Sequence, residues 1–386
     1  MDHQSPLVIY YHSVAPKPFE GWPLSFLTME LARFERQMEQ IVQRRWDTVF
    51  LDEWWNVRNG RTPARGRALC ITFDDGLLDN WVYAFPIIRK HGLKMTLFVC
   101  PELIEPTDRV RPNLENVWKG ECDMEKLVGL GQLSWGELRA MQRSGHVDVQ
   151  SHTMSHTKYI VSDALRSVYY GGFEGYYPLL NTFSVEEKPR YMDAPDFAQR
   201  MFLGTPLFEE TSSVVARKRA IDAGFLEEAR RLASQHDLSV VEERPAYERG
   251  LRELHARRMS EGGLVRSVES FPEQVERIEY EIIGSKRVLE KELDKPVRFL
   301  CWPHGGNSDG THAVAKQAGY VATTVGRMHA RRGAQDRIPR VGTDWRMAPA
   351  YARLKFDYKM GAHFGMQPYR AFWAMNDLKN TLLGRH

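Results

Sequence analysis

Short apolar runs alternate with segments of helical periodicity along most of the chain. Residues 68–73 are almost entirely apolar, as expected for a parallel strand that is covered on both faces. A helical stretch then runs to His91, Gly92 supplies its C-terminal cap, and residues 95–100 form the next apolar run. This order predicts a β-α-β unit.

The same alternation continues on both sides of this unit. We expect strands at residues 7–11, 147–152, 297–302 and 320–325, and helices after Thr28, from a capping box at Ser134 to Gly145, from Pro272, and at 311–318. Repeated β-α units with polar residues at the strand ends predict an α/β fold, either a parallel barrel or an open sheet.

One stretch interrupts the alternation. Residues 160–265 hold an aromatic-rich loop and charged helical segments without a β-α repeat, so we interpret them as an insertion that serves as a lid, a substrate-binding element or a dimer element. Residues 1–159 and 266–348 are then the two parts of the barrel. Residues 349–386 are expected to form a C-terminal helical extension packed on the outside, and peripheral membrane contact is the alternative.

Composition and charge narrow the class of protein. The chain has 386 residues, of which 42% are hydrophobic and 27% charged, and this is typical of a globular protein. Its formal charge of +3 and scattered basic residues argue against nucleic-acid binding. The sequence contains no apolar run long enough for a transmembrane helix. Four widely separated cysteines and a start without signal-peptide features favour free thiols and a cytoplasmic protein.

Two adjacent carboxylates, Asp74 and Asp75, follow the buried run at residues 68–73. Adjacent residues at a strand end point in different directions, so one carboxylate can bind a metal while the other faces a reactant. The alternative is an Asp pair that caps the backbone of a turn before a helix.

Two imidazoles, His152 and His156, follow the expected strand at residues 147–152. Side chains four residues apart meet on one side of a helical turn, where they can share one Zn²⁺-type ion. Together with Asp75 they offer two nitrogens and one oxygen, which leaves coordination positions for water and substrate. The alternative is a chance pair in a chain with 13 histidines.

A third strand end carries Trp302-Pro303-His304-Gly305-Gly306. Proline and glycine force a turn there, and its backbone N–H groups can point at a developing oxyanion, unless this is an ordinary β-α turn. His12 is a fourth strand-end polar residue, with a structural hydrogen bond as its alternative role. We expect Trp302, Pro303 and Tyr11 to contact the substrate.

Three segments carry these candidate residues: Thr72-Phe73-Asp74-Asp75-Gly76, Ser151-His152-Thr153-Met154-Ser155-His156 and Pro303-His304-Gly305. In this order they resemble the motifs of the polysaccharide deacetylase family. These proteins are metal-dependent carbohydrate N- and O-deacetylases. The resemblance covers about residues 5–158 and 268–342. It implies a distorted (β/α) barrel of about seven strands and a divalent metal, usually zinc and sometimes cobalt or nickel.

The resemblance also implies roles for individual residues. Asp74 matches the general base, Asp75, His152 and His156 match the metal ligands, and the backbone of His304 matches an oxyanion donor. Two departures stand out. Many members have an arginine where this chain has Cys301, and we expect Arg340 to supply that cation, with a surface arginine as the alternative. The catalytic acid is not evident from a motif, and His12 and His329 are the candidates.

These features together predict a metal-dependent hydrolase. It would remove an N-acetyl or related acyl group from an amino-sugar-containing glycan or a lipid-linked saccharide and release acetate. The alternatives are a catalytically idle metal- or glycan-binding domain and a hydrolase of another small amide or formamide. A homodimer remains open.

Overall fold

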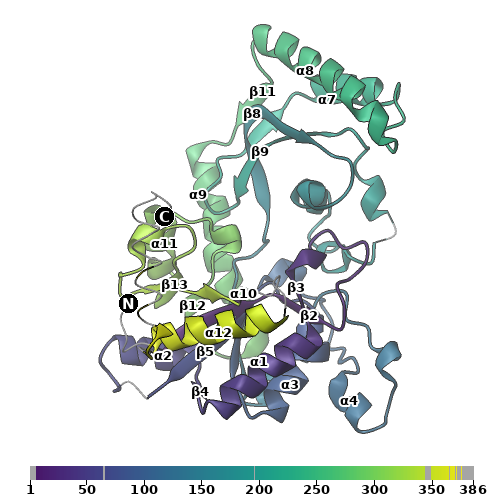
Figure 1. The fold of residues 1–386 in the computed structure, drawn as a ribbon. Helices are drawn as coiled ribbons and strands as arrows, with labels where there is room; N and C mark the ends of the chain where they lie inside the picture. Colours follow the sequence, from purple (N-terminus) through teal and green to yellow (C-terminus); the bar gives the residue numbers. More distant parts are fainter. Residues whose placement is uncertain are drawn as a thin grey trace.

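Nine parallel strands form the central sheet of this protein (Figure 1). The computed structural model describes residues 6–63, 66–194, 196–343, 349–364, 366–369, 371 and 375. In spatial order the strands are β14 (Arg337–Ile338), β13 (Ala322–Thr324), β12 (Phe299–Leu300), β7 (Val147–Ser151), β6 (Met95–Val99), β5 (Ala68–Phe73), β1 (Leu7–Tyr11) and β15 (Val341–Gly342), and β4 (Asp47–Thr48) pairs with β5.

The two ends of this sheet lie close together. Strands β14 and β15 stand at opposite ends of the strand order, yet only Pro339 and Arg340 separate them in the chain. Consecutive Cα atoms are 3.8 Å apart, so three peptide links span at most about 11 Å and the sheet has to curl on itself. The predicted α/β fold with a parallel, barrel-like sheet is confirmed. In the described residues this sheet has nine strands, whereas the family resemblance implies about seven; β4, β14 and β15 are pieces of only two residues.

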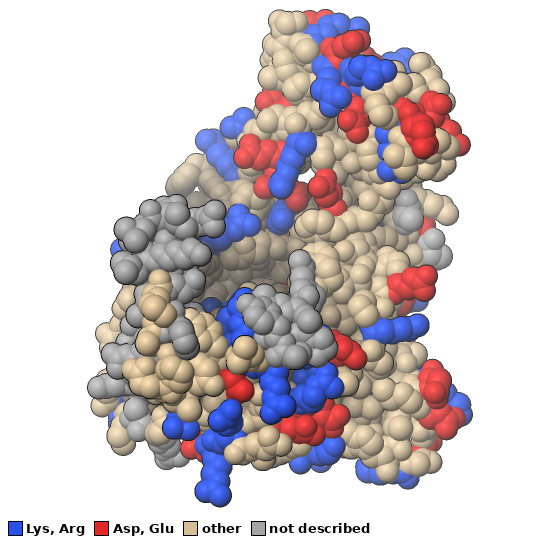
Figure 2. Space-filling view, viewed as in Figure 1, with Lys and Arg blue, Asp and Glu red and all other residues tan. Residues whose placement is uncertain are grey.

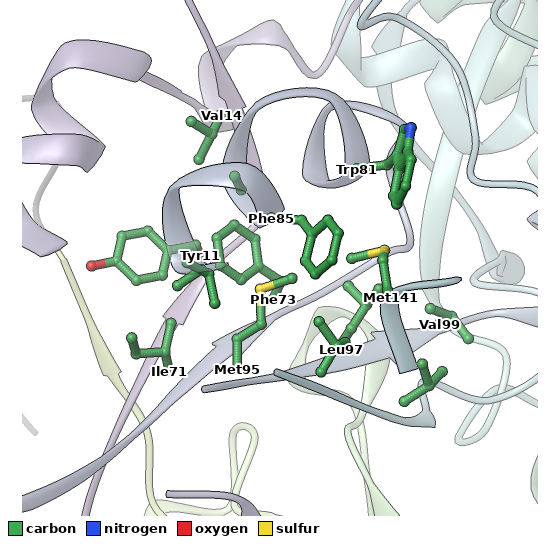
Figure 3. Packing of buried hydrophobic residues seen from close by; sticks show 14 of the residues in the cluster. Tyr11, Val14, Ile71, Phe73, Trp81, Phe85, Met95, Leu97, Val99 and Met141 are labelled. Atoms are coloured by element: carbon green, nitrogen blue, oxygen red, sulfur yellow. The ribbon is translucent and has the colours of Figure 1, made fainter. Parts of the chain in front are cut away.

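Alternate residues of each strand face two separate cores. Ile9, Ile71 and Leu97 belong to a large cluster that also contains helix residues, and Figure 3 shows Phe85 and Met141 packed over these strands. Val8, Cys70 and Phe98 belong to a second cluster with residues of β12, β13 and β14, which fills the inside of the curled sheet. The period of two along a strand therefore decides which side chains reach the interior.

Helices on the outside cover the sheet. They are α1 (Leu31–Gln43), α2 (Leu51–Arg58), α3 (Phe85–Lys90), α4 (Leu114–Trp118), α5 (Trp135–Arg143), α9 (Phe271–Glu279), α10 (Ser285–Leu293) and α11 (Asp309–Gln317). The capping box predicted at Ser134 is present, because its side chain accepts from the Glu137 N–H and Glu137 bonds the Ser134 N–H. The helix predicted from Pro272 is α9 and α10, joined by a π-helical turn at Tyr280–Gly284; a second such turn, Asn80–Ala84, precedes α3.

The inserted segment builds its own sheets. Strand β8 (Lys158–Val168) pairs antiparallel with β9 (Pro206–Ser212), and β10 (Arg219–Ile221) pairs with β11 (Val265–Val268). Helices α7 (Ala223–Ala233) and α8 (Arg244–Ser260) close a small core around Phe225 and Tyr247, and α6 (Tyr176–Leu180) lies nearer the barrel. Figure 1 shows α7 and α8 at the far end of this insertion. The sequence revealed none of these antiparallel strands.

The remaining elements flank the barrel. Strands β2 (Ser13–Ala15) and β3 (Thr28–Glu30) form a two-stranded sheet, and α12 (Pro349–His363) lies alongside α1 (Figure 1). The predicted boundary after residue 348 falls on 344–348, outside the described residues, as does most of 370–386. All four cysteines are free thiols, as predicted. Among the described residues, no helix has the length and apolar character that crossing a membrane requires.

Candidate metal centre and active-site pocket

The two adjacent carboxylates leave strand β5 on a sharp turn. Asp75 and Gly76 both have positive φ angles, 77° and 76°. A Cβ at Gly76 would lie 3.1 Å from Ile104 and 3.2 Å from Val99, so glycine is needed there both for its backbone and for its size. The turn aims the Asp75 carboxylate at the two histidines and the Asp74 carboxylate at Arg340. Neither side chain therefore serves mainly to cap the turn.

The two histidines come together in a loop that is not helical. His152 follows β7, and Thr153 and His156 have positive φ angles of 65° and 54°. The expectation that a helical turn brings the imidazoles together is therefore wrong. Their ring centroids are nevertheless 5.1 Å apart, because the left-handed residues fold the loop back on itself.

These three residues fit a divalent metal ion. Asp75 Oδ1 lies 3.2 Å from His152 Nε2 and 3.1 Å from His156 Nε2. His152 Nδ1 donates to the Cys301 carbonyl at 2.8 Å, so in the neutral ring the Nε2 lone pair faces the carboxylate. Asp75 Oδ1 is buried and has no hydrogen-bond partner among the described residues. Two lone pairs facing one buried carboxylate oxygen call for a cation between them.

The second carboxylate is held in its charged form. Arg340 Nη1 donates to Asp74 Oδ1 at 2.7 Å and Nη2 to Oδ2 at 2.8 Å, a bidentate ion pair. Burial by itself would raise the pKa of Asp74, but Arg340 and His152 outweigh it and hold that pKa below its ordinary value. Arg340 is thus placed where the sequence expectation put it, and it comes from the link between β14 and β15.

The side chain of His304 joins the site together with a tyrosine from the insertion. His304 has a φ angle of 56° in the turn Pro303–Gly305, and its ring centroid lies 4.5 Å from that of His156. The hydroxyl of Tyr177, on α6, lies 3.1 Å from His304 Nδ1. The pKa of His304 lies well below its ordinary value, mainly because the ring is buried and also because of the charges of His156 and Lys158. His304 Nε2 is buried without a partner among the described residues.

A carboxylate on a neighbouring segment supports the histidine loop. Glu281, which is only 1% exposed, accepts hydrogen bonds from the N–H groups of Met154 at 3.0 Å and Ser155 at 3.1 Å, and also from the Ser155 hydroxyl. It lies in the π-helical turn Tyr280–Gly284, a type of turn that is common at functional sites. Glu281 therefore fixes the loop that carries both histidines. No sequence motif pointed to it.

The two carboxylates, the three histidines, Tyr177 and Arg340 line one cavity of about 500 Å³, whereas Glu281 is not among its lining residues. The lining includes four residues that we expected to contact the substrate, to hold the oxyanion or to donate the proton: Trp302, His304, His12 and His329. His12 Nε2 lies 3.9 Å from Asp74 Oδ2. The Trp302 Nε1 atom is buried and has no partner among the described residues.

Two predicted substrate contacts are wrong. Tyr11 is buried in the outer core, where its hydroxyl donates to Gln37 at 2.7 Å and its ring stacks on Phe73. Its neighbour Tyr10 lines the cavity instead, because the period of two along β1 turns successive side chains to opposite faces. Pro303 is buried below the turn and is not a lining residue, whereas both of its neighbours are.

Several lining residues lie outside the motifs and were missed. They are Tyr10, Leu24, Phe26, Leu27, Phe173, Tyr177, Arg327 and Arg332. The aromatic-rich composition of the insertion was a signal for Phe173 and Tyr177. Nothing in the sequence showed which of its rings would reach the barrel.

The fold and site define an α/β barrel with an Asp-His-His cluster that could hold a metal ion. Comparison with known proteins agrees with this class: residues 61–195 match the polysaccharide deacetylase family model. "Putative polysaccharide deacetylase YxkH" from Bacillus subtilis (strain 168) is 26% identical over 92 residues, which cover 24% of this chain and 30% of that protein. The match thus spans less than a third of that relative's length. The resemblance to this family is confirmed for this part of the chain.

Solved structures of deacetylases are similar at low sequence identity. One is a de-N-acetylase from Aggregatibacter actinomycetemcomitans, with a TM-score of 0.47, 15% identity, and coverage of 82% of this chain and 86% of that one. Another is the Streptococcus pyogenes deacetylase PplD in complex with acetate, with a TM-score of 0.46, 13% identity, and coverage of 92% and 97%.

Proposed function

We propose that this protein is a metal-dependent hydrolase that removes an N-acetyl or related acyl group from an amino sugar, in a glycan or a lipid-linked saccharide, and releases acetate. One observation carries the proposal: the Asp75-His152-His156 set lies beside Asp74, a carboxylate held charged by Arg340. The match to the polysaccharide deacetylase family supports deacetylation. The metal, the acyl group and the sugar are part of the proposal.

The metal would be held by Asp75 Oδ1, His152 Nε2 and His156 Nε2. Two imidazole nitrogens and one carboxylate oxygen suit zinc, with cobalt or nickel as alternatives. When bound, such an ion supplies Lewis acidity to the acyl carbonyl and to the attacking water. Three protein ligands leave room for both.

Asp74 serves as the general base in this proposal. Its carboxylate is ionised at neutral pH, and the two hydrogen bonds from Arg340 fix the plane of that carboxylate. It can therefore accept the proton of an attacking water. His304 contributes its backbone N–H to the oxyanion, and the unpartnered Trp302 Nε1 and His304 Nε2 are available to the substrate in the cavity. His12, 3.9 Å from Asp74, is the candidate proton donor to the leaving amine, and His329 is the second candidate.

Two variants separate the base from the metal ligands. Asp74→Asn should retain its metal and lose about 100-fold or more in acetate release from N-acetylated oligosaccharides, because base catalysis typically contributes that much. His152→Ala should lose the metal itself. Metal content is measured by elemental analysis and acetate by a coupled assay, with the exposed Asp123→Asn as the matched control.

Either of two results would contradict these roles. They are full turnover in Asp74→Asn and full metal occupancy in His152→Ala. A substrate panel that includes formylated sugars and small cyclic amides distinguishes deacetylation from the hydrolysis of other amides. An idle binding domain would release neither acetate nor formate. Two features of the sequence favour that idle domain: Cys301 at the usual arginine position, and a catalytic acid that no motif identifies. The ion pair of Arg340 with Asp74 answers the first of them.

A further inference from the structure

Two solvent-exposed arginines at the cavity have no acidic partner among the described residues. Arg327 and Arg332 lie in the connection between β13 and β14 and line the cavity. Among the described residues, no carboxylate oxygen lies within 4.0 Å of either guanidinium group. Arg331, in the same connection but not a lining residue, pairs with Asp309 at 2.7 Å. The two lining arginines thus differ from their neighbour in facing the cavity with their charge uncompensated.

The charges of the cavity do not compensate them either. Of the described residues, the carboxylates that line it are Asp74, which Arg340 pairs, and Asp75, which faces the two imidazoles. Burial lowers the pKa of Lys158; Glu210 opposes this shift, and the charge of Arg327 adds to it. Figure 2 shows the molecule hollowed between the insertion and the barrel, with Lys and Arg atoms, and also Asp and Glu atoms, along the edge of the hollow.

Arg327 is close to the reacting centre. The Arg327 N–H donates to the Gly305 carbonyl at 2.8 Å. Gly305 follows His304, whose ring lies against His156. The turn Pro303–Gly305 therefore connects the backbone of Arg327 to the ring that packs against His156, one of the proposed metal ligands.

A sugar-binding surface lies at the same cavity. Phe26 and Phe173 meet edge to face at 5.2 Å between ring centroids, and they line the cavity together with Tyr177 and Trp302. Aromatic rings pack against the apolar faces of sugars, and a guanidinium group binds phosphate and carboxylate through paired N–H donors. The cavity thus combines surfaces for a sugar ring and for an anion.

We propose that the substrate carries an anionic group, a phosphate or a carboxylate, beside the acylated amino sugar, and that Arg327 and Arg332 bind this group. The proposal rests on the proposed function, because it concerns the same cavity. With a neutral glycan both exposed guanidinium groups would stay hydrated and would add nothing to binding beside the reacting sugar.

The experiment compares three acetylated sugars of similar size: methyl N-acetylglucosaminide, N-acetylglucosamine 1-phosphate and N-acetylmuramic acid. Binding to the Asp74→Asn variant, loaded with zinc, is measured by calorimetry at 50 and 300 mM salt. At least one anionic sugar should bind tenfold or more tightly than the neutral one, and this preference should shrink at the higher salt concentration. The phosphate and carboxylate arms show which anion the site selects.

Arginine variants then test the residues. Arg327→Gln and Arg332→Gln are added to the Asp74→Asn variant. They should weaken binding of the preferred anionic sugar at least fivefold more than binding of the neutral sugar. Adding Arg331→Gln instead should change the binding of neither sugar. Equal binding of the three sugars, no measurable binding of either anionic sugar, or a preference that the arginine variants keep, would overturn the proposal. Acetate release from a neutral sugar alone would leave the proposed function standing and refute only this inference.

Discussion

At the scale of single residues, the ion pair between Asp74 and Arg340 decides which form of the proposed base is present. A carboxylate as buried as Asp74 would be neutral over much of the acid range if it stood alone. The guanidinium of Arg340 reverses this by its charge and by two hydrogen bonds. The pair therefore keeps the base ionised although the Asp74 side chain is buried at the wall of the cavity.

Removing Arg340 should shift the pH profile. In Arg340→Gln the effect of burial on Asp74 is no longer opposed by this cation, so the pKa of Asp74 rises and the base is protonated at a higher pH. The acidic limb of kcat/KM should move to higher pH, and activity at neutral pH should fall. Arg340→Lys should move the limb less, because it restores the charge without the bidentate geometry.

The pH profile of acetate release, recorded for both variants and for Arg331→Gln as the control, checks this. If the acidic limb of Arg340→Gln coincides with that of the wild type, Arg340 does not control the protonation of Asp74.

At the scale of elements, segments far apart in the chain build the histidine loop. The loop after β7 carries His152 and His156, and the π-helical turn Tyr280–Gly284 supplies the Glu281 carboxylate that accepts its N–H groups. The extra residue of a π-helical turn changes which side chains face inward, so a periodic reading of residues 271–293 as one α-helix does not place Glu281.

Loss of this support should weaken metal binding. Two loop N–H groups share one oxygen of Glu281 and the Ser155 hydroxyl bonds the other. In Glu281→Gln the negative charge that strengthens all three bonds is lost and one of the two oxygens becomes an NH₂ group that cannot accept, so the loop holds the histidines less firmly. Changes to such supporting groups typically lower metal affinity by about 10- to 100-fold. Zinc affinity, measured by competition with a chromophoric chelator, and the visible spectrum of the Co²⁺ form should both change.

Glu279→Gln, on the same helical segment and exposed, is the matched control. Unchanged zinc affinity and an unchanged Co²⁺ spectrum in Glu281→Gln would show that the carboxylate does not position the loop. A drop in thermal stability without either change would leave it a purely structural role.

At the scale of the whole molecule, the proposed metal set links strand ends that the chain separates widely. Asp75 follows β5, and the histidines follow β7, across β6 from it. In the sheet these strand ends share one edge, and an ion held between them would tie them together. Closure by the link between β14 and β15 brings Arg340 to the same edge.

Metal removal should therefore lower stability as well as activity. A ligand that binds only the folded state stabilises it by RT ln(1 + [L]/Kd), which is about 2.7 kcal/mol at a hundredfold excess over Kd. Calorimetry should show a lower Tm after chelation and recovery when zinc returns. In His152→Ala, added zinc should not change the Tm. If the wild type has the same Tm with and without metal, a bound ion does not stabilise the folded protein.

Much of the site was predictable because its residues sit next to strand ends that periodicity reveals. Asp74, Asp75, His152 and Trp302 each follow an apolar run, and parallel strands bring such ends to one edge. Arg340 was predictable only as a replacement for the arginine missing at Cys301. The cytoplasmic location and the homodimer stay predictions.

The sequence by itself determined the α/β class, the free thiols and the strand-end acids and imidazoles, because these follow from local periodicity and residue chemistry. The tertiary structure alone decided the rest. It turned Tyr10 rather than Tyr11 to the cavity, placed Glu281 under the histidine loop and brought Tyr177 of the insertion to His304. Such contacts join residues up to 127 positions apart, and no local pattern encodes which distant side chain fills the space beside another.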